Sequence, residues 1–300
     1  MLRKRVGLDG EGLEAGLSQL QSGGTNLAVE VLWPPRDAAW DDHADTLLTI
    51  VVREDARLDG VGLARTPSEA RALVEAGKIA MVMSLEGAHG IDARGVPGLA
   101  ALHAKGLSLL GLTWSFSNKY AGSSGDGGAG LTALGYQLLV EANRLGVVLD
   151  VSHASDQTTM DVCGWSHAPV IASHSNADGV RNHARNLSDE AIRCVARTGG
   201  VIGVNLHGDF VGGTRDVAAA ADQAEYLRRV GGPGVVALGS DFDGLIKPIS
   251  GISNAGELGA LWTELARRGW TPEDIRAMQG ENFMRAWEGA VAIGRALRGE

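Results

Sequence analysis

Ionisable side chains follow closely after several short apolar segments of the sequence. They are Glu86 after residues 79–85, His153 after 147–151, His174 after 169–172, His207 after 200–206 and Asp241 after 235–238. If these segments are parallel strands of one barrel, their carboxyl ends meet at one mouth and these side chains converge there. Two imidazoles and one carboxylate with an open fourth position form a catalytic zinc site. Glu86, His153 and His174 are therefore the candidate metal ligands.

Hydrolysis is the chemistry that such a cluster would perform. A zinc ion held by these side chains lowers the pKa of its bound water toward ~7 and polarises a carbonyl oxygen. Asp241 would accept a proton from that water and pass it to a leaving amine. No short spacing in the sequence links the three candidate ligands. The alternative therefore stays open that they are polar groups at a barrel mouth whose hydrogen bonds are satisfied without a metal. His207 stands alone, and a structural role is favoured for it over a ligand role.

The other histidines and both cysteines lack the position that this chemistry requires. His43 and Asp45 form an HxD pair, but residues 40–52 have a helical pattern, which favours a solvated helix face. Cys163 and Cys194 lie in segments with helical patterns and lack CxxC spacing, which favours buried free thiols. The remaining four histidines follow no strand end and are interpreted as surface or loop residues: His89, His103, His167 and His183.

Short apolar segments alternate with helix-patterned segments along nearly the whole chain. The seven clear ones are residues 27–33, 79–85, 107–113, 147–151, 169–172, 200–206 and 235–238. Each has few charges and the length of a strand, as expected for parallel strands covered on both faces. An eighth, short strand is expected at residues 5–8. Thr66 and Thr271, each followed by a proline, predict helix starts, and Gly146 predicts a helix end.

Repeated strand–helix units leave two architectures, an open doubly wound sheet or a closed (β/α)8 barrel. No GxGxxG opens a helix after the first strand, and no GxxxxGK[ST] occurs in the sequence. The best markers of nucleotide-binding sheets are thus missing. We therefore predict an α/β fold of the TIM-type (β/α)8 barrel class, with a short or missing first strand. Because no linker or long repeat interrupts the pattern, one domain over residues 1–300 is expected.

The composition is that of an ordinary globular protein with an acidic balance. Of its 300 residues, 44% are apolar and 21% charged, and 27 basic against 36 acidic residues give a net charge of −9. This negative field repels nucleic acid and anionic lipid, so neither a nucleic acid nor a membrane is an expected partner. The basic start at residues 1–5 precedes no signal-peptide core, and no apolar run has bilayer length. We therefore expect a soluble cytoplasmic protein.

Seven segments carry a resemblance to a known family. They are Leu85-Glu86-Gly87, Asn143-Arg144-Leu145-Gly146, Asp150-Val151-Ser152-His153, Ser173-His174-Ser175, Arg185-Asn186, Gly199-Gly200-Val201 and Gly239-Ser240-Asp241-Phe242-Asp243-Gly244. In these segments, in their order and in the interval of 21 residues between His153 and His174, the sequence resembles the renal (membrane) dipeptidase family of metallopeptidases, family M19. The resemblance extends over residues 23–287.

The resemblance implies a (β/α)8 barrel of the metal-dependent hydrolase type, which carries two zinc ions bridged by a glutamate. The bridging glutamate matches Glu86, and the two histidine ligands of one zinc match His153 and His174. A small dipeptide-like substrate and a homodimer are expected on the same ground.

The resemblance also implies roles for residues outside the metal cluster. Arg185 matches the arginine that binds the substrate carboxylate, a task that suits its planar guanidinium. Asp241 matches the acid/base aspartate near the scissile amide. Asp243, two residues later, is interpreted as a structural carboxylate.

Two departures from the family pattern concern the second zinc and the substrate. Members of the family begin the barrel with an HxD motif that holds the other zinc. If Asp9 and Gly10 align with the residues before that motif, Glu11 replaces the histidine and Leu13, which cannot ligate a metal, replaces the aspartate. Alternatively, the chain starts late and the motif is missing. Trp114 stands where the family has a substrate-contacting histidine, and its indole donates a hydrogen bond but neither ligates nor titrates.

Three functions therefore remain open. The first is a zinc dipeptidase or related amide hydrolase that uses Glu86, His153 and His174. The second is a barrel that has lost catalysis and serves in binding or structure. The third is a one-metal hydrolase of another amide, lactone or ester, because fold alone does not fix function. Loss of one of two metals need not abolish hydrolysis, since one ion both activates water and polarises a carbonyl.

Overall fold

Parallel strands alternate with helices along the chain. The computed structural model describes residues 8–34 and 43–300. The strands are β1 (Leu27–Leu32), β2 (Val61–Leu63), β3 (Ile79–Glu86), β4 (Leu107–Gly111), β5 (Val148–Asp150), β6 (Val170–Ile171), β7 (Ile202–Val204) and β8 (Val236–Leu238). The helices are α1 (Leu17–Ser22), α2 (His43–Arg57), α3 (Pro67–Glu75), α4 (Val96–Ala104), α5 (Ala133–Leu145), α6 (Asp156–Trp165), α7 (Asp189–Arg197), α8 (Gly208–Val211), α9 (Val217–Gly231), α10 (Gly259–Arg267), α11 (Pro272–Arg276) and α12 (Asn282–Arg298). Within these ranges, no helix has both the length and the apolar character needed to cross a membrane.

The seven strands predicted from apolar segments are all present, although several are shorter than predicted. The strand that the sequence pattern missed is β2, which has only three residues and therefore no apolar run long enough to detect. The strand expected at residues 5–8 falls almost entirely outside the described residues, because residues 5–7 are not described.

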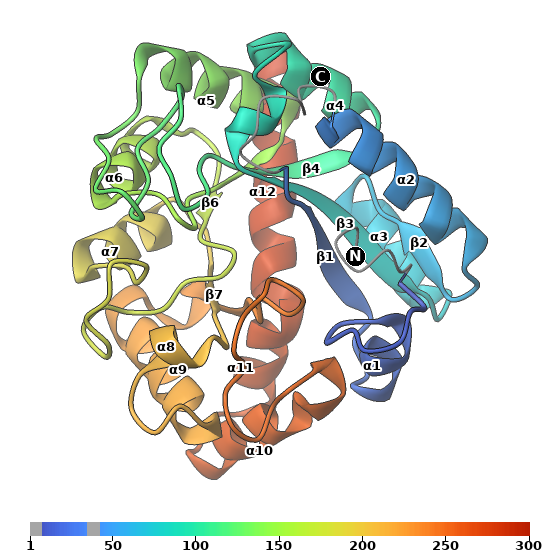
Figure 1. Cartoon of the computed structure of the whole chain (residues 1–300), viewed down its shortest axis with the longest axis vertical. Helices are drawn as coiled ribbons and strands as arrows, with labels where there is room; N and C mark the ends of the chain where they lie inside the picture. Colours follow the sequence, from blue (N-terminus) through green and yellow to red (C-terminus); the bar gives the residue numbers. More distant parts are fainter. Residues whose placement is uncertain (1–7, 35–42) are drawn as a thin grey trace.

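Apart from β2, which among the described strands pairs only with β3, strands that pair with each other follow one another along the chain. β1 pairs with β3, β3 with β4, β4 with β5 and β5 with β6, and β2 pairs with β3, all in parallel. β7 pairs with β8, and a parallel bridge between Ala172 and Ile202 connects the β6 end to β7. Figure 1 shows the helices arranged around these strands. In the described part of the chain, no ladder joins β8 to β1. The structure is thus an α/β fold with parallel strands, as predicted.

The predicted helix boundaries are confirmed. The Thr66 side chain accepts a hydrogen bond from the Glu69 N–H at the start of α3, and the Thr271 side chain accepts one from the Asp274 N–H at the start of α11. Each cap satisfies a backbone donor that the helix itself leaves unpaired. Gly146 ends α5 in the left-handed conformation, with a φ of 79°.

Helix α12 closes the amino-terminal end of the strands. Trp287 is fully buried and belongs to one apolar cluster with Val82 of β3. Arg285 donates hydrogen bonds to the carbonyl oxygens of Gly199 and Gly234, which lie just before β7 and β8. In Figure 1 the helix crosses the centre of the ring of strands. Because apolar side chains fill this end, a polar site has to lie at the other.

Side chains on the inner face of the strands become polar toward the carboxyl ends. Val82, Ser84 and Glu86 alternate along one face of β3. The register pairs Glu86 with Gly111 of β4, and Gly111 with Asp150 of β5. Paired residues of parallel strands point to the same face, so Glu86 and Asp150 share the inner face, opposite the end that α12 closes.

Candidate metal centre

Three side chains converge at the carboxyl ends of β3, β5 and β6. Glu86 Oε1 lies 3.1 Å from His153 Nε2 and 3.3 Å from His174 Nε2, and the two Nε2 atoms are 3.1 Å apart. Among the described histidines, cysteines and acids, these three form the one group of three or more whose ligand atoms lie close enough to share an ion. The structure thus brings together the three candidate ligands chosen from the sequence.

The spacing and the donor types of this group fit a metal ion. Zinc bonds of about 2.0–2.2 Å to nitrogen and oxygen place tetrahedral ligand atoms about 3.3 Å apart. The three ligand atoms here form a triangle with sides of 3.1 to 3.3 Å. A carboxylate and two neutral imidazole nitrogens are all acceptors, which repel one another unless a cation or proton lies between them. This donor set therefore suits one metal ion.

The backbone after each strand directs these side chains into one place. Glu86 is the last residue of β3, while His153 and His174 each follow the end of a strand by three residues. His153 has a φ of 66°, a left-handed conformation that residues other than glycine seldom adopt. Such conformations persist where the surrounding structure imposes them, and they cluster at functional sites.

Burial and charge set the protonation of the group. Burial raises the pKa of the Glu86 carboxyl, but the imidazoles of His153 and His174 outweigh it and hold that pKa well below its usual range. Burial, aided by the charge of Arg185, lowers the pKa of His153 to about 4. For His174, burial lowers the pKa, but the carboxylates of Asp241 and Glu86 raise it above its usual value. The ionised carboxylate of Glu86 thus faces a neutral imidazole at His153, and neutral imidazole is the form that binds metals.

Asp150 and Ser173 fix the orientation of His174. Asp150 Oδ2 accepts a hydrogen bond from the Ser173 hydroxyl, and Ser173 Oγ lies 2.7 Å from His174 Nδ1. Because the carboxylate only accepts and the hydroxyl has one proton, Ser173 donates to Asp150 and accepts from the Nδ1–H of His174. The lone pair of His174 Nε2 then points toward Glu86. Sequence reasoning gave neither residue a role at the site, although Asp150 ends β5 just as Glu86 ends β3.

Replacing Ser173 with alanine is expected to weaken metal binding although no ligand is removed. His174 loses the partner that selects its tautomer, and loss of such support costs about 10- to 100-fold in metal affinity. Competition with a chromophoric chelator at fixed pH measures this affinity. Ser173→Thr keeps the hydroxyl and is expected to bind metal nearly as tightly as the unaltered protein. Equal affinities of S173A and the unaltered protein would show that Ser173 does not orient the ligand.

Arg185 lies against the same group. Its guanidinium donates from Nη1 to Ser175 Oγ and from Nη2 to the His174 carbonyl oxygen, both at a distance of 2.8 Å. Its Nε is buried, and no described residue accepts a hydrogen bond from it. Burial lowers the pKa of this guanidinium, while the charges of Asp241 and Glu86 act in the opposite direction. A buried cation with a spare donor beside the metal ligands suits an anionic group.

Asp241 approaches the group from the segment after β8. Its φ of 64° is left-handed, and its Oδ2 accepts a 3.0 Å hydrogen bond from Asn205 Nδ2. Burial raises the pKa of this carboxyl, partly offset by the charges of His174 and Arg185. A carboxyl group positioned by its backbone and by an amide can exchange a proton next to the metal ligands.

Trp114 belongs to a cluster of aromatic rings beside His153. Its ring centroid lies 6.3 Å from that of His153, 4.9 Å from that of Trp33 and 5.8 Å from that of Phe116. The contacts with Trp33 and Phe116 are edge-to-face, an arrangement that aromatic pairs prefer. The structure therefore places Trp114 next to a candidate metal ligand. Sequence reasoning missed Trp33, the residue that follows β1 and packs against it.

Glu11 does not lie in the Glu86 group. Its side chain is exposed. Asp243 anchors the nearby backbone by accepting hydrogen bonds from the N–H groups of Glu14 and Ala15, at 3.1 and 3.0 Å. The Asp243 N–H donates in return to Glu14 Oε2. Asp243 thus has the structural contacts expected of it. The structure does not bring Glu11, the candidate ligand for a second ion, to the other ligands.

The remaining histidines make local contacts. His207 caps α8, because its Nδ1 accepts a hydrogen bond from the Asp209 N–H. His89 and His103 are half-buried rather than on the surface, and each ring contacts a backbone carbonyl oxygen. His43 begins α2, but its side chain lies outside the described part of the structure. These contacts assign His207 a structural role, as the sequence favoured.

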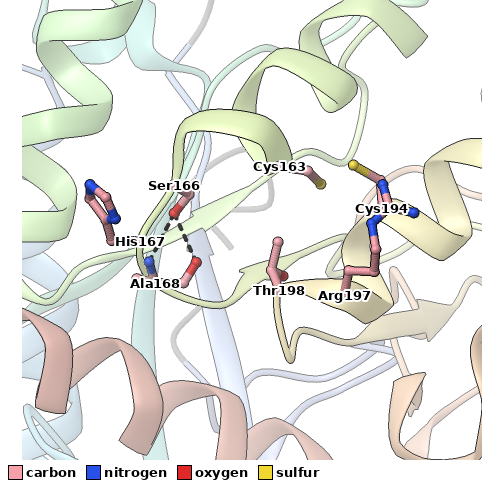
Figure 2. Close-up of a pocket in the computed structure, with 7 residues that line it drawn as sticks. All are labelled: Cys163, Ser166, His167, Ala168, Cys194, Arg197 and Thr198. Atoms are coloured by element: carbon pink, nitrogen blue, oxygen red, sulfur yellow. Dashed lines mark hydrogen bonds between the residues drawn. The ribbon is translucent and has the colours of Figure 1, made fainter.

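The two cysteines lie at the opposite end of the strands from the metal ligands. Figure 2 shows Cys163 of α6 and Cys194 of α7 facing each other. They line a cavity of about 250 Å³. The cavity is also lined by His167 and Thr198, which precede β6 and β7. Both thiols are free, and burial, with the neighbouring Cys194, raises the pKa of Cys163. Both cysteines are thus free, as predicted, but only Cys194 is buried, whereas Cys163 is half-buried.

Comparison with known proteins extends over nearly the whole chain. Residues 18–299 match the family model described as membrane dipeptidase (peptidase family M19). A dipeptidase named verJ from Clonostachys rogersoniana is 32% identical over 85% of this chain, and an uncharacterized dipeptidase of Schizosaccharomyces pombe is 35% identical over 71% of it. The chain spans 66% and 53% of the lengths of these two relatives.

A solved structure shares the fold. The metallopeptidase of Rhodobacter sphaeroides, liganded with a phosphinate mimic of the dipeptide L-Ala-D-Ala, superposes with a TM-score of 0.85 at 26% identity. The match covers 96% of this chain and 93% of that one. Since such metallopeptidases are of the TIM-barrel type, this similarity confirms the barrel-type α/β fold predicted from the sequence.

Proposed function

The chain belongs to the membrane dipeptidase family, peptidase family M19, and on this premise we propose that it is a zinc-dependent dipeptidase. The observation that carries the proposal is the convergence of Glu86, His153 and His174, whose ligand atoms lie 3.1 to 3.3 Å apart. Relatives described as dipeptidases support the reaction class. A dipeptide mimic bound to a metallopeptidase of the same fold supports the substrate class.

We assign one zinc ion to Glu86, His153 and His174. Two imidazole nitrogens and one carboxylate oxygen are the donors of many catalytic zinc sites. When bound, zinc supplies a Lewis acid that polarises a carbonyl oxygen and acidifies water. A single ion is proposed because these three residues form the only such ligand group among the side chains that the structure describes, and Glu11 lies outside it.

The residues around the ligands divide the remaining tasks. Arg185 binds the substrate carboxylate, and its unpaired, buried Nε supports this role. Asp241 takes a proton from the attacking water and returns it to the leaving amine, supported by its half-buried position and by the interaction of its charge with His174. Trp114 contacts the substrate from the side of His153, supported by its ring position.

Metal analysis combined with a dipeptide panel tests the proposal. The purified protein, reconstituted with zinc and freed of excess ion, is expected to hold about one equivalent. It is expected to hydrolyse dipeptides, and the panel includes substrates with D-configured carboxyl-terminal residues. Failure to retain zinc would favour a binding or structural protein. Retention of zinc with turnover of esters or lactones, but of no dipeptide, would favour a different hydrolase.

A further inference from the structure

The inner face of β1 stays apolar where the neighbouring strand becomes polar. The register pairs Val29 with Val82 and Val31 with Ser84, so these valines lie on the face of the sheet that carries Glu86. Val29 and Val31 are 37% and 47% exposed, although strand side chains on the inner face of a barrel are normally buried. The β1 side of the site thus offers apolar surface to a ligand.

Two tryptophans continue this apolar surface up to the metal ligands. Trp33 follows β1 directly, and its ring packs edge-to-face on Trp114, with centroids 4.9 Å apart. Trp114 in turn lies 6.3 Å from the ring of His153. Phe116 is buried and supports Trp114 from another side, at 5.8 Å. Because the rings hold one another in place, they form a preorganised surface that a ligand meets without ordering it first.

We propose that Val31, Trp33 and Trp114 form an apolar wall that selects dipeptides with a large apolar side chain. This inference rests on the proposed dipeptidase function and adds the class of substrate. A side chain that leaves water for this wall gains free energy in proportion to its apolar area, whereas glycine gains none. The charged groups of a dipeptide would meet other residues of the site, since Arg185 supplies a buried cation and Glu86 and Asp241 supply carboxylates. The wall therefore adds selectivity by size and apolarity.

Substrate series with one varied residue test the wall. Dipeptides with glycine, alanine, leucine or phenylalanine at the amino-terminal position, and a second series varied at the carboxyl-terminal position, are compared by kcat/KM. In one of the two series we expect phenylalanine or leucine to exceed glycine by about 10- to 100-fold. Trp114→Ala is expected to remove most of this ratio, with a larger loss of kcat/KM for the phenylalanine or leucine substrate than for the glycine substrate. Trp114→Phe keeps an aromatic ring and should retain most of the ratio.

Trp165→Ala provides the matched control, because this tryptophan of α6 is 65% exposed and packs on Tyr136 rather than at the site. In this variant, the ratio of kcat/KM between the phenylalanine and glycine dipeptides should equal that of the unaltered protein. Equal turnover of all dipeptides by the unaltered protein would overturn the wall. An equal loss for every substrate in Trp114→Ala would also overturn it, because it would indicate a contact with the substrate backbone or ammonium group.

Direct binding separates failure of the wall from failure of the dipeptidase proposal. Calorimetry on the zinc-loaded Asp241→Asn variant compares the Kd of the same glycine and phenylalanine dipeptides without hydrolysis. Tighter binding of the phenylalanine dipeptide that depends on Trp114, in a protein that hydrolyses no dipeptide, would support the wall and refute the activity. Hydrolysis without a binding preference would do the reverse. Absence of any dipeptide binding would refute both.

Discussion

Replacing His174 with alanine is expected to remove both the metal and dipeptide hydrolysis. The variant loses one of three protein ligands, leaving Glu86 and His153 3.1 Å apart without their third partner. Structural zinc sites with four ligands are worth about 10–16 kcal/mol, so one ligand accounts for about 3–4 kcal/mol, or 10²- to 10³-fold in affinity. Metal content after gel filtration and kcat/KM for a dipeptide are the two measurements. Glu86→Gln is expected to give the same result, since an amide is a weaker ligand and carries no charge.

A histidine remote from the ligands provides the control for this experiment. His167 lines the cavity between α6 and α7, at the opposite end of the strands. His167→Ala also removes one imidazole, but it should retain one equivalent of zinc and nearly full activity. Metal retention and full turnover in His174→Ala would refute the assigned site, whatever the behaviour of His167→Ala. Equal losses in both variants would point to a folding defect, which circular dichroism would detect.

The position of the metal ligands was predictable because it follows from topology. Parallel strands end at one edge, and the inner-face residues at those ends have to meet. Glu86 needs only the end of β3, and His153 and His174 need only to follow β5 and β6 closely. Strands such as β3 and β4 were visible as apolar runs since both of their faces are buried. β2 escaped detection because three residues with a central glycine carry no periodic signal.

The contacts that orient these ligands were not predictable from the same pattern. The hydrogen bonds that Ser173 donates to Asp150 and accepts from His174 depend on side-chain torsions and on the distance between β5 and β6, which residue types alone do not give. The same holds for Trp33, whose ring meets that of Trp114 although β3 separates β1 from β4 in the sheet. Alignment made Glu11 a candidate ligand, but alignment carries no information on where an irregular segment points.

Replacing Asp241 with asparagine is expected to lower kcat/KM for dipeptides by about 10²- to 10⁴-fold while zinc remains bound. The amide cannot take a proton from water, but its oxygen can still accept the hydrogen bond from Asn205, so the geometry should persist. Asp243→Asn in the same segment is the matched control, because Asp243 binds the N–H groups of Glu14 and Ala15 instead. It should lower the free energy of unfolding by about 1 kcal/mol and leave turnover nearly unchanged. Turnover at the unaltered rate in Asp241→Asn would exclude this carboxyl from proton transfer. An equal loss of turnover in both variants would instead mean that the segment after β8 acts through its conformation, with Asp241 and Asp243 holding it in place.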